Sequence, residues 1–205
     1  LIEGIKNIDQ TDIINANQLG FKIKLVGVAE LIDNKILQRV HPVLIKNKSY
    51  IAKINGVLNA VIVGSKPVGQ SVLQGEGAGA GPTTSSLISD LCSILRGNIK
   101  FPFVISDKRR KSALFESVNN KKFSVYLRLD VKDKHGVLSN IAEVMAKNKV
   151  SIKRLIQNPT ENKKNASIII ITHHSKSSSL QKIITVLKDK KYIISKPKLI
   201  RIEDI

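Results

Sequence analysis

The stretch FSVYLRLDVKDKHGVLSNIAEVMAKNKVSI, residues 123–152, changes its hydrophobic period twice. Apolar and polar residues alternate over residues 123–131, which predicts a half-buried β-strand. DKHG, residues 133–136, is a turn signal. Residues 137–149 then predict an amphipathic helix that buries Val137, Ile141, Val144 and Met145. Alternation returns after this helix, so the stretch predicts a strand–helix–strand unit.

The rest of the C-terminal half continues this pattern. Strands are predicted over residues 150–158, 166–174 and 192–202, and a second amphipathic helix over residues 178–190. Together these elements predict a self-contained βαββαβ domain at residues 122–205. Two helices on one face of a four-stranded antiparallel sheet make a compact α+β architecture.

Residues 130–145, DVKDKHGVLSNIAEVM, together with Ser151-Ile152 and Gln157, resemble the ACT domain of amino-acid-controlled enzymes. The resemblance implies a ferredoxin-like fold. It also implies that two copies pair side by side and bind a free amino acid between them, and threonine is the effector we expect. The chain is therefore expected to form a homo-oligomer.

The ACT resemblance implies a set of effector-binding residues, which are Asp133, Gly136, Val137, Ser151 and Ile152. Asp133 would accept from the ammonium of the ligand, and Gly136 would let the turn backbone approach it. The N–H groups that open the helix suit a carboxylate, and Ser151 would donate from the facing strand. The alternative is that Asp133 and His135 are turn residues only, with Asp133 as the N-cap of the helix.

The N-terminal half has a different pattern. A short helix is predicted over residues 11–20, with Thr11 as its N-cap and Gly20 at its end. Two strand pairs follow, residues 21–32 with 35–45 around the turn Asp33-Asn34, and residues 56–65 with 67–74.

Residues 74–90, QGEGAGAGPTTSSLISD, place glycines at alternate positions before an apolar run. Glycine at this density costs conformational entropy, which predicts a close approach to the backbone. The helix that follows, to about Arg96, is predicted to bury Leu87, Ile88, Leu91, Cys92 and Leu95. On this face Cys92 is expected to be a packed thiol.

Several segments of this half resemble the C-terminal part of the homoserine dehydrogenase catalytic domain. They are EGI (3–5), LGFKIKLVGVA (19–29), VHPVLI (40–45), KINGVLNAVIV (53–63) and GEGAGAGPTTSSLISDL (75–91). The predicted fold class is therefore mixed α/β, a partial catalytic and dimerisation domain at residues 1–106 followed by a linker at 107–121 and the ACT domain.

The homoserine dehydrogenase resemblance implies oxidoreductase activity with NAD(P) as cofactor and a small-molecule substrate, in which L-homoserine and L-aspartate 4-semialdehyde interconvert. It implies that Gly79 contacts the cofactor and that Gly75 and Gly77 shape the approach. The alternative is that these glycines serve only a tight strand-to-helix crossover. A second alternative for the whole chain is a non-catalytic amino-acid-binding protein.

No residue of the sequence is predicted to be catalytic. The glycine run does not have the Gly-x-Gly-x-x-Gly spacing of a dinucleotide-binding fingerprint and follows a late strand. Lys22 and Lys24 are expected to face solvent, and Glu3 to be structural. No metal site is predicted, because His173 and His174 point to opposite faces of a strand. Since Leu1 lies directly in an apolar segment, we expect the chain to be a piece of a longer protein.

The formal charge of +18 raises the possibility of nucleic-acid binding, but 27 of the 34 basic residues are scattered lysines with few aromatic residues between them. The tightest clusters, Lys108–Lys111 and Lys163–Lys164, fall in predicted linkers or turns. We therefore expect no nucleic-acid partner. The single cysteine predicts a reducing, cytoplasmic location. No apolar run has the length of a membrane span, so no membrane partner is expected.

Overall fold

The computed structural model describes residues 1–98, 107–110, 112–159 and 164–205. It divides into two compact units. We call residues 1–47 with 114–205 the sheet unit, and residues 48–113 the hairpin unit. The end of the predicted first domain (99–106), Lys111 and Lys163 lie outside the described residues, and the predicted domain limits stay a prediction. Of the described helices, none is both long and apolar enough to span a membrane.

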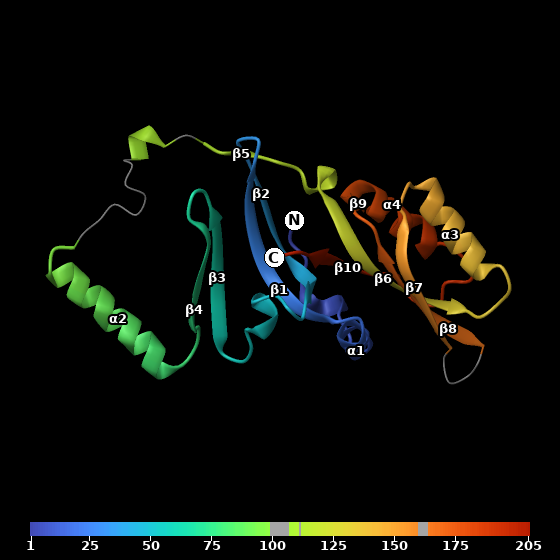
Figure 1. Ribbon diagram of the computed structural model, residues 1–205, viewed down its shortest axis with the longest axis horizontal. Helices are drawn as coiled ribbons and strands as arrows, with labels where there is room; N and C mark the ends of the chain where they lie inside the picture. The colour runs from blue at the N-terminus through green and yellow to red at the C-terminus, as the bar shows by residue number, and fades with distance from the viewer. Residues whose placement is uncertain (99–106, 111, 160–163) are drawn as a thin grey trace. The chain divides into compact units, whose positions relative to one another are not determined.

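The sheet unit is built on a mixed sheet whose strands lie in the order β1-β2-β10-β6-β8-β7 (Figure 1). The strands in chain order are β1 (Phe21–Ile32), β2 (Lys35–Lys46), β6 (Lys122–Lys132), β7 (Ile152–Pro159), β8 (Asn165–Thr172) and β10 (Lys198–Glu203). Two short strands flank it, β5 (Leu114–Phe115) on β2 and β9 (Ser175–Lys176) on β6. Short 3-10 helices η1 (Ile5–Asn7) and η4 (Val118–Asn120) lie between its larger elements, whereas η3 (Asp107–Arg109) belongs to the hairpin unit.

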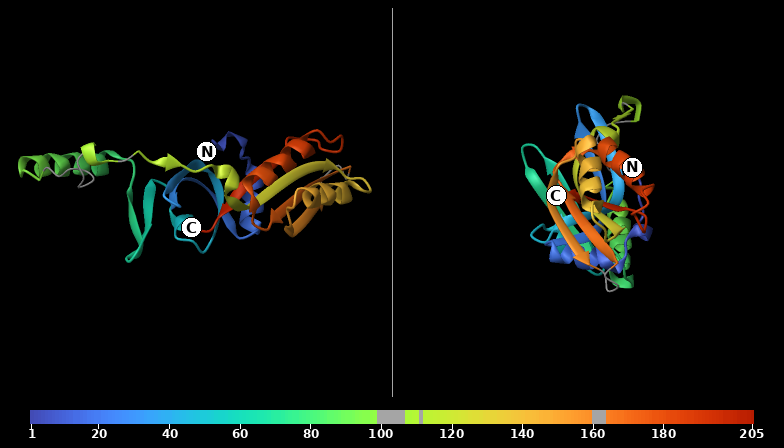
Figure 2. Two further views of the ribbon diagram at one scale, coloured as in Figure 1. Left: turned by 90° about the horizontal axis from the view of Figure 1, so that it is seen from above. Right: turned by 90° about the vertical axis from the view of Figure 1, so that its right-hand side faces the viewer.

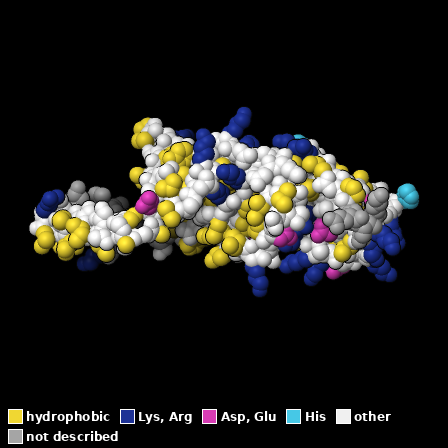
Figure 3. All heavy atoms as spheres, turned by 90° about the horizontal axis from the view of Figure 1, so that it is seen from below, with side chains coloured by type: hydrophobic (Ala, Val, Ile, Leu, Met, Phe, Trp, Pro, Cys, Tyr) yellow, Lys and Arg dark blue, Asp and Glu magenta, His cyan; other side chains and the backbone are white. Residues whose placement is uncertain are grey.

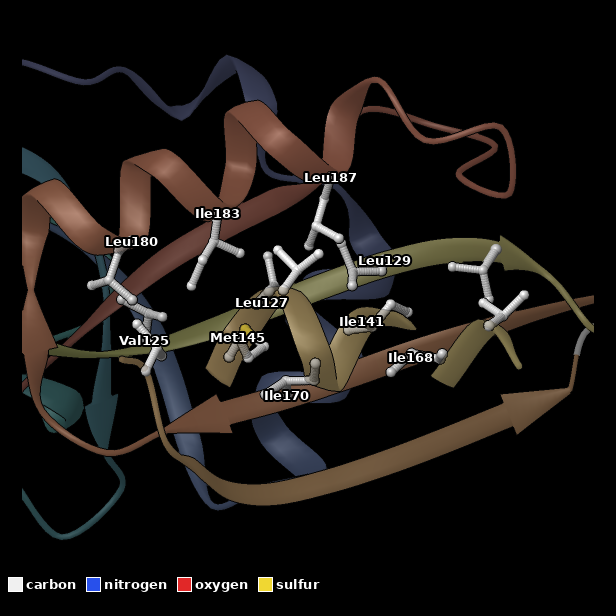
Figure 4. Close-up of a cluster of buried hydrophobic side chains, with 14 of the residues drawn as sticks. Val125, Leu127, Leu129, Ile141, Met145, Ile168, Ile170, Leu180, Ile183 and Leu187 are labelled. Atoms are coloured by element: carbon white, nitrogen blue, oxygen red, sulfur yellow. The ribbon is translucent and has the colours of Figure 1, made fainter. Parts of the chain in front are cut away.

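The predicted βαββαβ arrangement of the C-terminal half is confirmed. Helices α3 (Val137–Lys147) and α4 (Ser177–Lys188) cover one face of the sheet, as Figure 2 shows. Their apolar faces meet side chains of β6 and β8 in one core, which includes Leu127, Leu129, Ile141, Met145, Ile168, Ile170, Ile183 and Leu187 (Figure 4). The last strand is shorter than predicted, because residues 192–197 are not strand and β10 begins at Lys198.

Residues 1–47 add to this domain, and its predicted ability to fold alone stays a prediction. The outer edge of β10 pairs in parallel with β2, with Arg201 opposite Val43. The second face of the sheet carries another apolar cluster, in which Tyr126 and Ile169 lie with Ala16 of α1 (Gln10–Gln18). Residues 1–47 therefore complete the sheet at one edge and cover its second face.

Local signals in residues 1–47 were largely predicted. The Asp33-Asn34 turn is confirmed, since both residues have positive φ (48° and 62°), as a two-residue hairpin turn requires. The helix cap differs from the prediction. Asp9, not Thr11, caps α1, because its side chain accepts from the N–H of Asp12 while the Asp12 side chain accepts from the N–H of Asp9.

The hairpin unit contains η2 (Ile51–Lys53), the strand pair β3 (Leu58–Ser65) and β4 (Gly69–Glu76), and helix α2 (Ala80–Leu95). The apolar stripe of α2 was predicted to be buried, but it is exposed in this chain. Leu87, Leu91 and Leu95 are 65%, 53% and 78% exposed, and Cys92 is half-buried. Apolar side chains are visible along α2 at the left of Figure 3. The helical spacing was correct, but no packing partner for the stripe is found among the described residues.

Candidate functional site

The turn between β6 and α3 holds the first part of the predicted effector site. Gly136 is the N-cap of α3 and has φ +82°, a left-handed conformation that favours glycine. The N–H of Asp133 donates to the carbonyl of Lys164 at 2.8 Å, and its carboxylate accepts from Nε2 of Gln157 at 3.3 Å. The alternative in which Asp133 caps α3 is therefore wrong, and its carboxylate points toward β7 at the surface.

The first N–H group of α3 is already occupied, because that of Val137 donates to the carbonyl of Lys134 at 3.3 Å. The N–H of Asn140 donates to Gly136. The N–H groups of Leu138 and Ser139 lie between these two bonds, where the opening turn of a helix presents donors to an anion. The side chain of Val137 is 7% exposed and belongs to the core, so any role of this residue in effector binding falls to its backbone.

Ser151 and Ile152 lie at the other end of the sheet from Asp133. Ile152 pairs with Thr172 at one end of β8, whereas Asp133 follows Lys132, which pairs with Asn165 at the other end. The intervening length of β8 is roughly 20–25 Å at about 3.3 Å per residue. One copy of the chain therefore does not bring Asp133 and Ser151 to one ligand.

The glycine run ends β4 and opens α2. A Cβ at Gly77 would lie 1.3 Å from Nδ2 of Asn59, so the close approach at this position comes from a side chain of the same hairpin. Gly79 has φ +119° and is the N-cap of α2. Gly75 and Gly81 face open space. The crossover alternative therefore accounts for Gly77 and Gly79 and leaves Gly75 and Gly81 without a packing reason. The sequence carries no signal of the contact that Asn59 makes.

Both halves of the chain are similar to known proteins. Residues 1–92 match the homoserine dehydrogenase family, and residues 125–191 match the ACT domain family. Homoserine dehydrogenases from Helicobacter pylori and Neisseria gonorrhoeae are each 33% identical over the whole chain, which covers 48% of each. A homoserine dehydrogenase structure from Thiobacillus denitrificans matches 98% of this chain and 47% of that one, with a TM-score of 0.85 and 30% identity.

The chain is therefore similar over its whole length to homoserine dehydrogenases, and it carries an ACT domain. Both resemblances drawn from sequence are confirmed. The chain spans about half the length of the curated relatives it matches.

Ion pairs join the ACT domain to the homoserine dehydrogenase segment. Arg128 of β6 donates from Nε to Asp12 at 2.7 Å and from Nη2 to Asp9 at 2.5 Å. Asp12 is fully buried and Arg128 is 7% exposed. In the same way Arg201 of β10 donates to Glu3 at 2.7 Å, which confirms the structural role expected of Glu3. These arginines hold residues 1–12 against the sheet.

A second buried cluster lies where β2 and β10 pair. Arg39 of β2, whose side chain is fully buried, donates to both carboxylate oxygens of Glu203 at 2.9 and 3.1 Å. Nε2 of His41 lies 3.6 Å from the same carboxylate. Burial alone would raise the pKa of Glu203, but His41, Arg39 and the charge of Lys121 outweigh it and lower this pKa to about 2. The cluster is therefore held together by an ionised carboxylate.

These ion pairs were not predicted from the sequence. The available signal was residue type, because arginine forms bidentate carboxylate pairs better than lysine. Three of the arginines in this lysine-rich chain, Arg39, Arg128 and Arg201, are buried in such pairs. Lys22 and Lys24 are both half-buried on β1 rather than fully exposed. Among the described residues no group of three or more His, Cys, Asp or Glu could hold a metal ion.

Proposed function

We propose that this chain is the part of a homoserine dehydrogenase that supplies one wall of the NAD(P) cleft and carries an amino-acid-sensing ACT domain. The complete enzyme would interconvert L-homoserine and L-aspartate 4-semialdehyde, on the route to threonine, methionine and isoleucine. The observation that carries the proposal is the similarity of the whole chain, in both sequence and fold, to homoserine dehydrogenases.

Residues of the glycine run fit one edge of a dinucleotide. No atom lies within 4 Å of the place of a Cβ at Gly75 or Gly81, which leaves room beside them. Gly79 turns the chain into the N-terminus of α2, where N–H groups and the helix dipole favour a phosphate. NAD(P) would supply the hydride acceptor. The residues of this chain would only bind and orient it, because the sequence carries no dinucleotide fingerprint and no candidate for proton transfer.

An ACT site shared between two copies supports the sensing role. Asp133 and the N–H groups of Leu138 and Ser139 would bind the ammonium and carboxylate of an amino acid, threonine in the first instance. Ser151 of a second copy would complete the site, because Ser151 of the same copy lies at the far end of the sheet. Strand β7 ends the sheet and presents an unpaired edge that a second copy can approach.

A chimera tests the catalytic proposal. The part of the Helicobacter pylori enzyme that this chain does not cover is fused ahead of Leu1, and homoserine-dependent formation of NAD(P)H is measured. We expect activity in the chimera, at least a tenfold loss with Gly79→Val, and none from the 205 residues alone. A soluble, folded chimera that is inactive beside the active parent enzyme would contradict the proposal and favour a non-catalytic amino-acid-binding protein.

A mixing experiment tests the sensing proposal. Asp133→Ala removes a charge-assisted hydrogen bond, so threonine affinity should fall about ten- to a hundredfold by calorimetric titration. Asp189→Ala, the same charge change at the exposed end of α4, is the matched control and should leave the affinity unchanged.

The second arm of that experiment combines variants. Mixing Asp133→Ala with Ser151→Ala chains should restore full affinity at about a quarter of the sites if two copies share each site. No restoration after subunit exchange would contradict a shared site. No heat with threonine or any other proteinogenic amino acid would contradict sensing altogether.

A further inference from the structure

A cavity of about 420 Å³ lies inside the sheet unit, where residues 1–47 pack on the ACT domain. One wall comes from residues 3–8 and Pro42, and the other from α4 and residues 196–200. None of the predicted effector residues lines it. Its volume falls within the range of small-molecule pockets, which is about 300–1,000 Å³.

The lining combines an apolar surface with separated charges. Ile8, Ile184 and Leu199 supply aliphatic contacts. Lys196 is exposed and makes no ion pair among the described residues, so its ammonium is available to an anion. Glu3 is half-buried, and its Oε2 is held at 2.7 Å by Arg201, which fixes the carboxylate at the wall.

The two walls are fixed to each other without a ligand. Nζ of Lys198 donates to the carbonyl of Asn7 at 2.5 Å and lies 3.2 Å from Asp9. Nη1 of Arg201, which follows the second wall on β10, donates to Oε2 of Glu3 at 2.7 Å. Because these contacts hold both walls, little ordering would be required when a small molecule enters, and a preformed site binds with a smaller entropy loss.

We propose that this cavity binds a small aliphatic α-amino acid at a site separate from the ACT effector turn. Lys196 pairs with the carboxylate, Glu3 accepts from the ammonium, and the apolar lining takes the aliphatic side chain. A ligand here contacts both walls, so its binding stabilises the packing of residues 1–47 on the ACT domain. The proposal rests on this cavity alone and is independent of the proposed enzyme activity.

The test uses the 205-residue chain labelled with ¹⁵N and titrated with leucine, and separately with its 2-oxo acid, 4-methyl-2-oxopentanoate. We expect leucine to shift amide signals of Gly4, Asn7 and Gln181 and to leave those of residues 133–139 unchanged. The 2-oxo acid, which has no ammonium for Glu3, should bind at least fivefold more weakly. Equal affinities would contradict the role of Glu3.

Two variants locate the site and one controls for charge. Lys196→Ala should weaken leucine binding about tenfold, the loss expected for one partly exposed charge-assisted contact. Gln181→Trp, which fills the cavity from the exposed face of α4, should abolish binding while the spectrum stays that of a folded chain. Lys182→Ala on the same helix should change nothing.

The outcomes decide the proposal cleanly. The proposal is overturned if leucine causes no shift at the cavity up to a concentration of about 20 mM, since binding weaker than this would not be assigned to a site. Shifts confined to residues 133–139 also overturn it, since they place the ligand at the ACT turn. Leucine binding that survives both Lys196→Ala and Gln181→Trp would place the ligand elsewhere.

Discussion

The sheet unit and the hairpin unit differ in which side chains they bury and which they expose. The sheet unit buries charge, with Arg39, Arg128 and Arg201 each paired to a carboxylate under the surface. The hairpin unit exposes apolar surface, with Leu73, Leu87 and Leu95 all more than 60% exposed. From this difference we expect residues 1–47 and the ACT domain to form one folding unit, whereas the described residues of 48–113 contribute to neither buried apolar cluster.

The largest effect is expected from breaking a buried pair in the sheet unit. Arg128→Met leaves Asp12, which is fully buried, without its cation, and should lower the free energy of unfolding by about 3–5 kcal/mol. Urea denaturation measures it. Lys147→Met, which breaks an exposed pair with Glu143, is the control and should cost no more than about 0.5 kcal/mol. If both variants lost the same free energy of unfolding, burial would add nothing to the contribution of the Arg128–Asp12 pair.

Acid should affect the sheet unit next most strongly. The pKa of Glu203 is about 2 in the folded chain, against an ordinary value of 4.5, so its ionisation stabilises the fold above the unfolded pKa. This stability, up to about 3 kcal/mol, should be lost as the pH falls from about 5 to 2. Glu203→Gln should flatten the pH dependence of unfolding in that window. An unchanged pH profile in the variant would contradict the ionised pair.

Replacing a glycine by alanine should change stability in opposite directions in the two units. Gly136→Ala forces a side chain into a left-handed conformation and should destabilise the sheet unit by about 1–2 kcal/mol. Gly81→Ala on α2, where a Cβ meets open space, should instead stabilise that helix by up to about 1 kcal/mol. Thermal unfolding followed by circular dichroism measures both, and a gain from Gly136→Ala would contradict the assigned turn.

The smallest effect is expected at the exposed stripe of α2. Leu91→Ala removes an apolar side chain that is 53% exposed, and should change the free energy of unfolding by less than about 0.5 kcal/mol. Leu129→Ala, in the core of the sheet unit, is the matched comparison and should cost about 2–5 kcal/mol. A loss at Leu91 as large as that at Leu129 would show that the stripe is packed in solution.

Sequence predicted the elements better than their partners. Periodicity gave α3, α4 and the β1–β2 hairpin, because a buried face repeats at the spacing of its own element. It could not show that β2 pairs with β10, since that contact joins residues more than 150 positions apart. The same holds for the α2 stripe, whose spacing predicts an apolar face but does not identify what covers it.

The candidate site shows the same limit. The DKHG turn predicted a ligand-accessible glycine, and Gly136 does adopt positive φ. The sequence pattern could not show that Ser151 lies at the opposite end of the sheet from Asp133, because that depends on strand register. Nor could it find the pairs of Arg39 and Arg128, whose partners become neighbours only in the folded chain.

Native-state hydrogen exchange tests most directly whether residues 1–47 and the ACT domain form one folding unit. Amides of β2, β10 and β6 should share one high opening free energy, equal to that of global unfolding, because pairing and buried ions join these strands. Amides of β3 and β4 should exchange far faster. The contrary result is that the amides of β1 and β2 exchange at a lower opening free energy than those of β6 and β10. The hairpin of residues 21–46 would then open while the ACT strands stay closed, and the two segments would not form one folding unit.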